Sequence, residues 1–187
     1  GIILPSSIIE YSFETHTREA AHEKKIIGRL AADIVEEGDV IYLDCGTTVF
    51  NMTLALEERI KNQELTNITI VTNSIANVLV LTPSISCKVV LIGGMYNGAR
   101  RDFSGILTES YLQSFHFTKC FLGADGVSNS MAVTSTEVEI SQLNRSVMKR
   151  SDTTYILIDH SKFGKNSFIS YARLSDVTGI VTDQQPD

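Results

Sequence analysis

The sequence predicts an α/β protein built around a mostly parallel sheet. Two observations support this prediction. Apolar runs of strand length alternate with amphipathic helical segments, which is the order that βαβ units produce. The first strand-like run, residues 40–43, is apolar without alternation, as is typical of a parallel strand that is covered on both faces. At 187 residues, the chain is long enough for one substantial domain with a buried core.

The first expected elements are a helix, the strand over residues 40–43 and a second helix. Residues 19–37 repeat Ile, Leu, Ala and Val side chains on one helical face, and Gly38 is a natural stop for that helix. After the strand and a tight polar turn, residues 48–60 are expected to form a helix with Val, Met, Leu and Ile on one side.

Two more strands and a helix are expected before the middle of the chain. Residues 68–71 are predicted to form a strand. Residues 75–81 are predicted to be helical and to stop before Pro83. A strand over residues 88–92 follows and ends in two glycines. The longest irregular segment is then expected over residues 95–104.

The alternation continues to the end of the chain. A short helix is expected over residues 107–115, and a strand over residues 120–122 is followed by a polar loop. Thr134 to Glu137 match a capping box, and the helix that this box opens is expected to run to Lys149. The remaining expected elements are a strand over residues 155–158, a brief edge strand over residues 168–171 and a last strand over residues 179–182.

The composition argues against several classes of function. A net charge of −6 argues against nucleic-acid binding by this chain alone, because such binding requires a basic surface. No apolar run is long enough to span a membrane, and the start does not have the pattern of a signal peptide. Three cysteines without a CxxC pair indicate reduced thiols in a cytoplasmic protein. The four histidines lack the paired spacing of a metal site, so we expect no metal and no cofactor.

The turn after the first strand, Asp44-Cys45-Gly46-Thr47-Thr48, is the most informative stretch. Gly46 permits a sharp turn, and the two threonines place hydroxyl and backbone N–H groups where the next helix opens. The helix dipole favours negative charge there, so the turn suits an anion such as a phosphate. The alternative is that Thr47 or Thr48 only caps the helix. Cys45 is a weak candidate nucleophile, because no histidine adjoins it in the sequence.

Polar or glycine-rich residues follow five of the predicted strands. Because ligands bind beyond the carboxyl ends of parallel strands, these loops are expected to form one site. They suit a ligand that carries a phosphate and several hydroxyl groups, although strand-end loops are commonly polar for structural reasons alone. The loops comprise residues 44–48, 72–74, 93–94, 123–126 and 159–162.

Several of these motifs occur together and in order between residues 20 and 183. They are Glu23-Lys24, Asp44-x-Gly46-Thr47-Thr48, Thr72-Asn73-Ser74, Gly93-Gly94, Phe103-Ser104-Gly105, Phe121-Leu122-Gly123-Ala124-Asp125-Gly126, Asp159-x-Ser161-Lys162-Phe163-Gly164 and Val181-Thr182-Asp183. This combination resembles the effector-binding, C-terminal domain of DeoR-type bacterial transcription repressors. The resemblance implies a three-layer α/β/α sandwich like that of the sugar-phosphate isomerases and deaminases. It also implies a phosphorylated sugar as effector and a cytoplasmic homo-oligomer.

By this resemblance, an N-terminal winged helix-turn-helix would normally precede the sensor domain and bind DNA. That segment is absent from this chain. We therefore expect residues 1–18 to be a connecting segment and residues 19–187 to be the sensor domain. The start at Gly1 instead of Met agrees with this expectation. The chain departs from the family at Cys45, where a small residue such as Ser is usual. It departs again at Asn144, where the loss of a usual lysine puts a ligand contact in doubt.

The strand-end positions and the matched motifs together suggest how a sugar phosphate would be held. Thr47, Thr48 and the neighbouring amides would hold the phosphate, and Lys162 would add positive charge. Asp44 and Asp125 would accept hydrogen bonds from sugar hydroxyls. The full set of expected ligand-binding residues is Asp44, Gly46, Thr47, Thr48, Thr72, Asn73, Ser74, Gly93, Gly94, Ser104, Gly105, Asp125, Glu139 and Lys162.

Several of these roles have a structural alternative. Lys162 could be a solvated surface lysine, and Asp44 or Asp125 could hold its own turn through backbone N–H groups. Glu139 could be an exposed helix residue. Arg100 and Arg101 could close over the phosphate from their loop, but solvated loop arginines are the more common case.

Three functions are compatible with the sequence. The favoured one is a ligand sensor, in which the effector stabilises one arrangement of loops and subunits. The second is an enzyme on the same fold, a sugar-phosphate isomerase or deaminase, with a carboxylate of Asp44, Asp125 or Glu139 for proton transfer. The third is a dimerisation module with a vestigial site, which predicts no response to any ligand.

Overall fold

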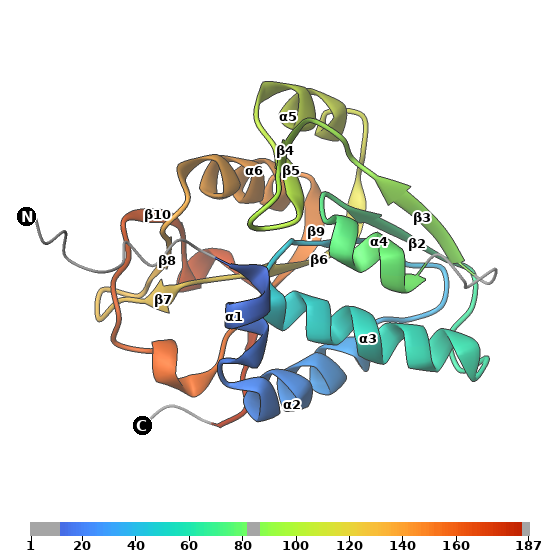
Figure 1. Ribbon diagram of the computed structural model, residues 1–187, viewed down its shortest axis with the longest axis horizontal. Helices are drawn as coiled ribbons and strands as arrows, with labels where there is room; N and C mark the ends of the chain where they lie inside the picture. Colours follow the sequence, from blue (N-terminus) through green and yellow to red (C-terminus); the bar gives the residue numbers. More distant parts are fainter. Residues whose placement is uncertain (1–11, 82–86, 185–187) are drawn as a thin grey trace, which may run out of the picture.

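A six-stranded sheet lies at the centre of the protein, with helices on both faces (Figure 1). The computed structural model describes residues 12–81 and 87–184. The strands of this sheet are β1 (Val40–Leu43), β2 (Ile68–Thr72), β3 (Cys87–Leu91), β6 (Phe117–Gly123), β9 (Ser151–Leu157) and β11 (Gly179–Val181). Their order is β11-β9-β6-β1-β2-β3, and every pairing between them is parallel. The α/β class is confirmed.

Helices α2 (Ala21–Ala32), α3 (Thr47–Lys61) and α4 (Ile75–Leu81) cover one face of the sheet, and α5 (Ile106–Leu112) and α6 (Val138–Met148) cover the other. Strand β1 contributes to both cores because side chains alternate across a strand. Ile41 and Leu43 pack in the core under α2 and α3, and Tyr42 packs in the core under α5 and α6. All three are 0% exposed. The three-layer α/β/α sandwich is therefore confirmed.

The strand order reverses between β1 and β6. From β1 the chain continues to β2 and β3 on one side of the sheet, whereas β6, β9 and β11 continue on the other side. The connections that leave these two neighbouring strands diverge, and a crevice forms beyond their carboxyl ends. The fold thus provides a ligand position at the turn after β1 and the loop after β6.

Two small antiparallel sheets are inserted into this framework. One is the hairpin of β4 (Met95–Asn97) and β5 (Asp102–Ser104). The other consists of β7 (Gly126–Val127), β8 (Ala132–Ser135) and β10 (Ile169–Arg173), with β10 at its edge. The expectations of an irregular segment over residues 95–104 and of a loop after the strand over residues 120–122 were therefore wrong. These strands are too short to produce a periodic pattern.

The N-terminal part of the chain differs from the expected single helix over residues 19–37. A separate helix α1 (Phe13–Arg18) precedes α2, and Ala20, with a left-handed φ of 47°, separates the two. Helix α2 ends before Ile34 and Val35. These two residues continue the aliphatic pattern because they also pack against the core, although their backbone is not helical. The apolar runs at residues 2–4 and 8–9 suggest short strand pieces, and both runs lie outside the described residues. The boundary at residue 18 stays a prediction.

The capping box expected at Thr134 to Glu137 does not form. Thr134 and Ser135 are the last residues of β8, and α6 begins at Val138 with Glu137 as its N-cap and no side-chain cap bond. Ser135 instead accepts the Glu137 N–H through its hydroxyl, at 3.2 Å. The motif therefore marks a strand-to-helix connection, which turns out to border the candidate site.

Candidate ligand-binding site

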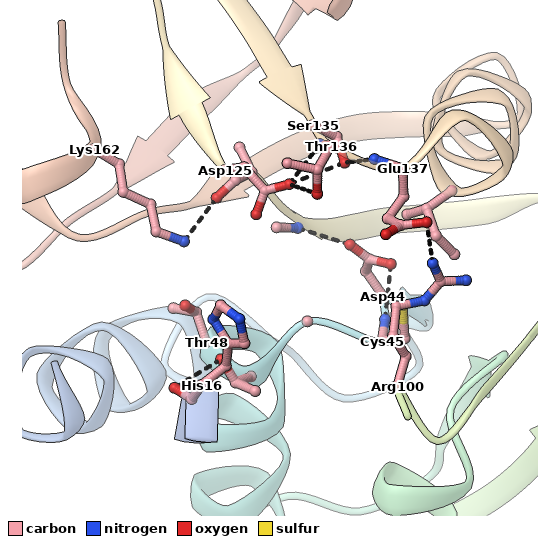
Figure 2. Close-up of a pocket in the computed structure, with 15 residues that line it drawn as sticks. His16, Asp44, Cys45, Thr48, Arg100, Asp125, Ser135, Thr136, Glu137 and Lys162 are labelled. Carbon is pink, nitrogen blue, oxygen red and sulfur yellow. Dashed lines mark hydrogen bonds and ion pairs between the residues drawn. The ribbon is translucent and has the colours of Figure 1, made fainter. Parts of the chain in front are cut away.

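A pocket opens beyond the carboxyl ends of β1 and β6, at the point where the strand order reverses (Figure 2). Its wall combines the turn after β1, the first turn of α3, the loop after β6 and the connection from β8 to α6. Helix α1, the turn between β4 and β5 and the 3-10 helix η1 (His160–Lys162) complete the wall. The lining residues are His16, Asp44, Cys45, Gly46, Thr47, Thr48, Arg100, Gly123, Ala124, Asp125, Ser135, Thr136, Glu137, Ile140 and Lys162.

The N-terminus of α3 faces this pocket. Gly46 is the N-cap and has no side chain to cap the helix. The first intrahelical hydrogen bond runs from the Phe50 N–H to the Gly46 carbonyl at 2.9 Å. The N–H groups of the first helical turn have no intrahelical acceptor. The interpretation that Thr47 or Thr48 merely caps the helix is therefore wrong. Thr47 and Thr48 are buried and line the pocket.

Two lysines lie near this helix end. Lys162 lines the pocket, and its ammonium donates a 3.0 Å hydrogen bond to the Ala124 carbonyl. The second, Lys24, is 3% exposed and donates to the main-chain carbonyl of His16. Burial, followed by the charge of Lys162, lowers the pKa of Lys24 to about 8. The arrangement concentrates positive charge beside a helix N-terminus in a chain whose net charge is −6.

Asp44 joins the two central strands at the base of the pocket. Its carboxylate accepts hydrogen bonds from the backbone N–H of Cys45 at 2.7 Å and of Gly123 at 2.9 Å. The Asn144 side-chain amide also donates to it, at 3.4 Å. Burial raises the pKa of Asp44, and the backbone hydrogen bonds oppose that rise. The turn-holding role considered for Asp44 is therefore present, alongside its position in the pocket wall.

Asp125 also has both features. One of its carboxylate oxygens accepts hydrogen bonds from the Ser135 hydroxyl at 3.2 Å and from the Thr136 N–H and hydroxyl at 2.7 and 3.0 Å. These bonds fix the connection between β8 and α6. The residue lies opposite His16 and Thr48 across the pocket (Figure 2).

Arg100 lies in the wall of the pocket and is 6% exposed. Its guanidinium forms ion pairs with Asp102, at 2.9 Å, and with Glu137. Burial alone would lower the pKa of Arg100, but Asp102 raises it above the ordinary arginine value. The expectation of a solvated arginine is therefore wrong for Arg100. Arg101 is exposed, pairs with Glu14 and is not among the lining residues.

Cys45 is 7% exposed and lines the pocket. Burial raises the pKa of its thiol well above the usual value, and the charge of Asp44 raises it further. The thiol is therefore protonated at neutral pH. This environment is the opposite of the electropositive one that activates a nucleophilic cysteine.

The predicted site residues at the end of β2 do not line the pocket, and Asn73 supports the hairpin of β4 and β5 instead. The Asn73 side chain accepts from the Tyr42 hydroxyl at 3.0 Å and donates to the Phe103 carbonyl at 2.8 Å. The Thr72 hydroxyl donates to the Leu43 carbonyl at 2.7 Å and accepts from the Ser74 N–H at 3.1 Å. A ligand-binding role for these residues stays a prediction.

The remaining predicted residues lie around the start of α5. A Cβ on Gly94 would approach the Thr108 hydroxyl to 2.0 Å, so Gly94 is needed for close packing. Gly93 accepts from that hydroxyl at 3.1 Å, and Gly105 is the N-cap of α5 with a φ of 91°. The Ser104 hydroxyl donates to Glu139 on α6. These residues are not among those that line the pocket, and their ligand-binding role stays a prediction.

Sequence reasoning missed several lining residues. His16 was placed in the connecting segment, and Ser135, Thr136 and Glu137 were interpreted as a capping box. Lys24, which contacts the lining residue His16 without lining the pocket itself, was recognised only as part of a matched motif. No local signal places α1 or the β8–α6 connection at this pocket, because both reach it through tertiary contacts.

A sequence profile described as the DeoR C terminal sensor domain matches residues 19–184. The chain belongs to the DeoR C-terminal sensor domain family. The resemblance noted in the sequence is therefore confirmed.

Curated relatives in this family are named as repressors. The chain is 34% identical over 172 residues to the lactose phosphotransferase system repressor of Staphylococcus epidermidis, a match that covers 91% of the chain and 65% of the relative. The lactose phosphotransferase system repressor of Streptococcus mutans is 36% identical, with coverage of 93% and 66%. The HTH-type transcriptional repressor GlcR of Bacillus subtilis is 32% identical, with coverage of 100% and 70%. The chain thus spans about two thirds of the length of these relatives.

Solved structures similar to the chain include a D-ribose-5-phosphate isomerase in complex with phospho-erythronic acid. It has a TM-score of 0.57 and 20% identity, with coverage of 76% of this chain and 54% of the isomerase. The eIF2B delta subunit of Chaetomium thermophilum has a TM-score of 0.61 and 13% identity, with coverage of 92% and 60%. At such low identity the likeness concerns the fold alone. None of the helices in the described part of the chain is long and apolar enough to cross a membrane.

Proposed function

We propose that this chain is the sensor domain of a transcriptional repressor and that its effector is a phosphorylated sugar. The observation that carries the proposal is that the α3 N-terminus and Lys162 line one pocket, with Lys24 hydrogen-bonded to the main-chain carbonyl of the lining residue His16. Backbone N–H groups at a helix start bind anions, and lysine ammonium groups strengthen that binding. A phosphate fits this combination better than a neutral ligand does.

The opposite wall of the pocket suits the sugar. Asp125 has a second carboxylate oxygen, and the Thr136 hydroxyl lies beside it. Glu137 and Arg100 form an ion pair at the wall and offer both an acceptor and a donor. Hydroxyl groups can donate and accept, so they can pair with each of these groups. The ligand would therefore lie with its phosphate at α3 and its hydroxyls toward the loops after β6 and β8.

The other partners follow from the family. In our proposal, DNA is bound by another domain of the full-length repressor, the protein acts in the cytoplasm and it functions as a homo-oligomer. The net charge of −6 agrees with a domain that does not itself bind nucleic acid, because such binding requires a basic surface.

Thermal unfolding of the chain in the presence of phosphorylated sugars tests this function. The panel contains ribose 5-phosphate, glucose 6-phosphate, galactose 6-phosphate and fructose 6-phosphate, with inorganic phosphate and the free sugars as controls. A ligand at a hundred times its Kd stabilises the fold by about 2.7 kcal/mol. We expect stabilisation by one sugar phosphate and not by its free sugar. If no member stabilised the chain, the proposal would fail in favour of a module with a vestigial site.

A sugar-phosphate isomerase or deaminase is the second candidate function. It is favoured by Asp44, a buried carboxyl with a raised pKa in the pocket wall, because such groups serve as general acids or bases. Against it, both Asp44 oxygens are already engaged by backbone N–H groups. Each mixture from the unfolding panel is therefore checked for product. Catalytic product formation that Asp44→Asn abolishes would favour the enzyme.

A further inference from the structure

Helix α1 forms part of the pocket wall through His16 (Figure 2). The main-chain carbonyl of His16 accepts hydrogen bonds from two groups, the Lys24 ammonium and the Thr47 hydroxyl, the latter at 3.5 Å. Thr47 lines the pocket where we place the phosphate, and the Lys24 ammonium meets it at the same carbonyl. A main-chain oxygen of α1 therefore already occupies an acceptor position between a buried lysine and the start of α3.

We propose that the effector phosphate displaces helix α1 from this position, and that the displacement carries the signal from the pocket to the chain that precedes α1. This inference rests on the proposed function, since it describes the regulation of the same pocket. A phosphate oxygen is charged and the His16 carbonyl is neutral. The Lys24 ammonium would therefore meet a full opposite charge in place of a carbonyl dipole. The Thr47 hydroxyl would exchange a neutral hydrogen bond for a charge-assisted one, which is roughly twice as strong, so the phosphate competes with the carbonyl for both donors.

A second set of contacts joins α1 to the turn between β4 and β5, on the other side of the pocket. The Phe13 N–H donates to the Ala99 carbonyl at 3.0 Å, in the turn between β4 and β5. Arg101 of that turn lies over the Phe13 ring at 5.5 Å and pairs with Glu14. Arg100, which lies between Ala99 and Arg101 in the sequence, lines the pocket. Helix α1 therefore contacts both the lysine side and the arginine side of the site.

Helix α1 depends on these contacts for its position. It has six residues, and an isolated helix of that length is unstable in water. Apart from the hydrogen bonds of His16, its main anchor is Phe13, which is 3% exposed and packs edge-on against Phe50 with ring centroids 5.3 Å apart. Loss of the His16 contacts would therefore weaken a segment that is held by few groups.

Hydrogen exchange of the full-length repressor tests the displacement directly. The probe is the sugar phosphate from the panel above that stabilises the chain most. We expect this ligand to slow amide exchange in α3 and in the loop after β6, and to accelerate exchange in residues 13–18. If the ligand slowed exchange in α1 as well, α1 would be a lid that closes on the ligand, and the inference would be overturned while the proposed function stood.

Binding measurements on α1 variants test the same coupling from the opposite direction. Coupling is reciprocal, so loosening α1 must raise the affinity for the ligand. We expect Phe13→Ala to lower the Kd of the sugar phosphate at least about fivefold, at the low end of typical coupling factors. Phe168→Ala is the matched control, because Phe168 is 79% exposed and is not among the lining residues.

A second variant covers the case in which Phe13→Ala does not fold. Arg101→Gln removes the exposed ion pair with Glu14 and the guanidinium over Phe13, and it should lower the Kd in the same direction by a smaller factor. An unchanged or increased Kd in both folded variants would refute the displacement. If no sugar phosphate in the panel bound to the wild-type protein, the proposed function and this inference would fail together.

Discussion

The Asp44 carboxylate accepts a hydrogen bond of 2.9 Å from the backbone N–H of Gly123. This bond ties the end of β1 to the end of β6, which are the two strands between which the strand order reverses. A second bond, from the Cys45 N–H at 2.7 Å, fixes the turn that leads into α3. One buried carboxylate thus sets the relative position of the two loops at the base of the pocket.

We predict that Asp44→Asn destabilises the fold. Asparagine presents only one oxygen, so its NH₂ group would face the N–H of either Cys45 or Gly123 and leave that donor unsatisfied. An unsatisfied buried donor costs about 1–3 kcal/mol, which chemical unfolding would detect. Asp152→Asn is the control, because the Asp152 side chain is 60% exposed. Equal stability of the two variants would contradict this role.

A pH effect is expected at the end of β9. His160 Nδ1 lies 2.6 Å from an oxygen of Asp183, and this hydrogen bond raises the pKa of His160. Because the folded-state pKa is the higher one, the stabilisation is fully present below the unfolded value of about 6.5 and is lost as the pH rises through the folded-state pKa. An NMR titration of His160 should give a pKa that Asp183→Asn lowers. The same pKa in both proteins would rule out this pairing.

Two adjacent glycines provide a matched test of packing. A Cβ on Gly94 would lie 2.0 Å from the Thr108 hydroxyl and 2.8 Å from the Ser104 carbonyl, whereas a Cβ on Gly93 would meet nothing within 4 Å. We expect Gly94→Ala to destabilise the fold by about 1–3 kcal/mol, as overpacking does. Gly93→Ala should change stability much less. The reverse order in thermal unfolding would show that α5 does not pack against Gly94 in this way.

The buried ion pair of Arg100 and Asp102 should matter more than an exposed one. Asp102 is 0% exposed, so Asp102→Ala leaves a buried guanidinium without its main partner and should cost about 3–5 kcal/mol. The control is Glu14→Ala, which breaks the exposed pair with Arg101 and should cost at most about 1 kcal/mol. Similar losses in the two variants would argue that Arg100 is solvated.

The sequence was sufficient to predict the main sheet and the centre of the pocket. The apolar run at residues 40–43 and the polar turn after it are local signals of a buried parallel strand and of the helix start that follows. The positions of Asp44, Thr47, Thr48, Asp125 and Lys162 at one pocket follow from the common direction of the strands. Parallel strands bring their carboxyl ends to one edge, and this rule needs no knowledge of side-chain contacts.

Other parts of the site could not be predicted, because they depend on contacts between distant segments. Arg100 was expected in solvent, and it is buried because Asp102 and Glu137 pair with it. The prediction that every strand-end loop joins one site did not allow for the position of β2 and β3 beyond β1 in the sheet. The loop after β2 therefore supports the hairpin through Asn73, and the sequence contains no sign of this difference.

The most direct test of the proposed phosphate position is calorimetry. The sugar phosphate that stabilises the chain most is titrated into the wild type, Lys162→Met and Lys165→Met. Lys162 lines the pocket, whereas Lys165 is exposed and is not among the lining residues. We predict that Lys162→Met raises the Kd at least about tenfold, which corresponds to about 1.4 kcal/mol, and that Lys165→Met leaves it unchanged. Equal binding by all three proteins would contradict the assignment of the phosphate to this pocket.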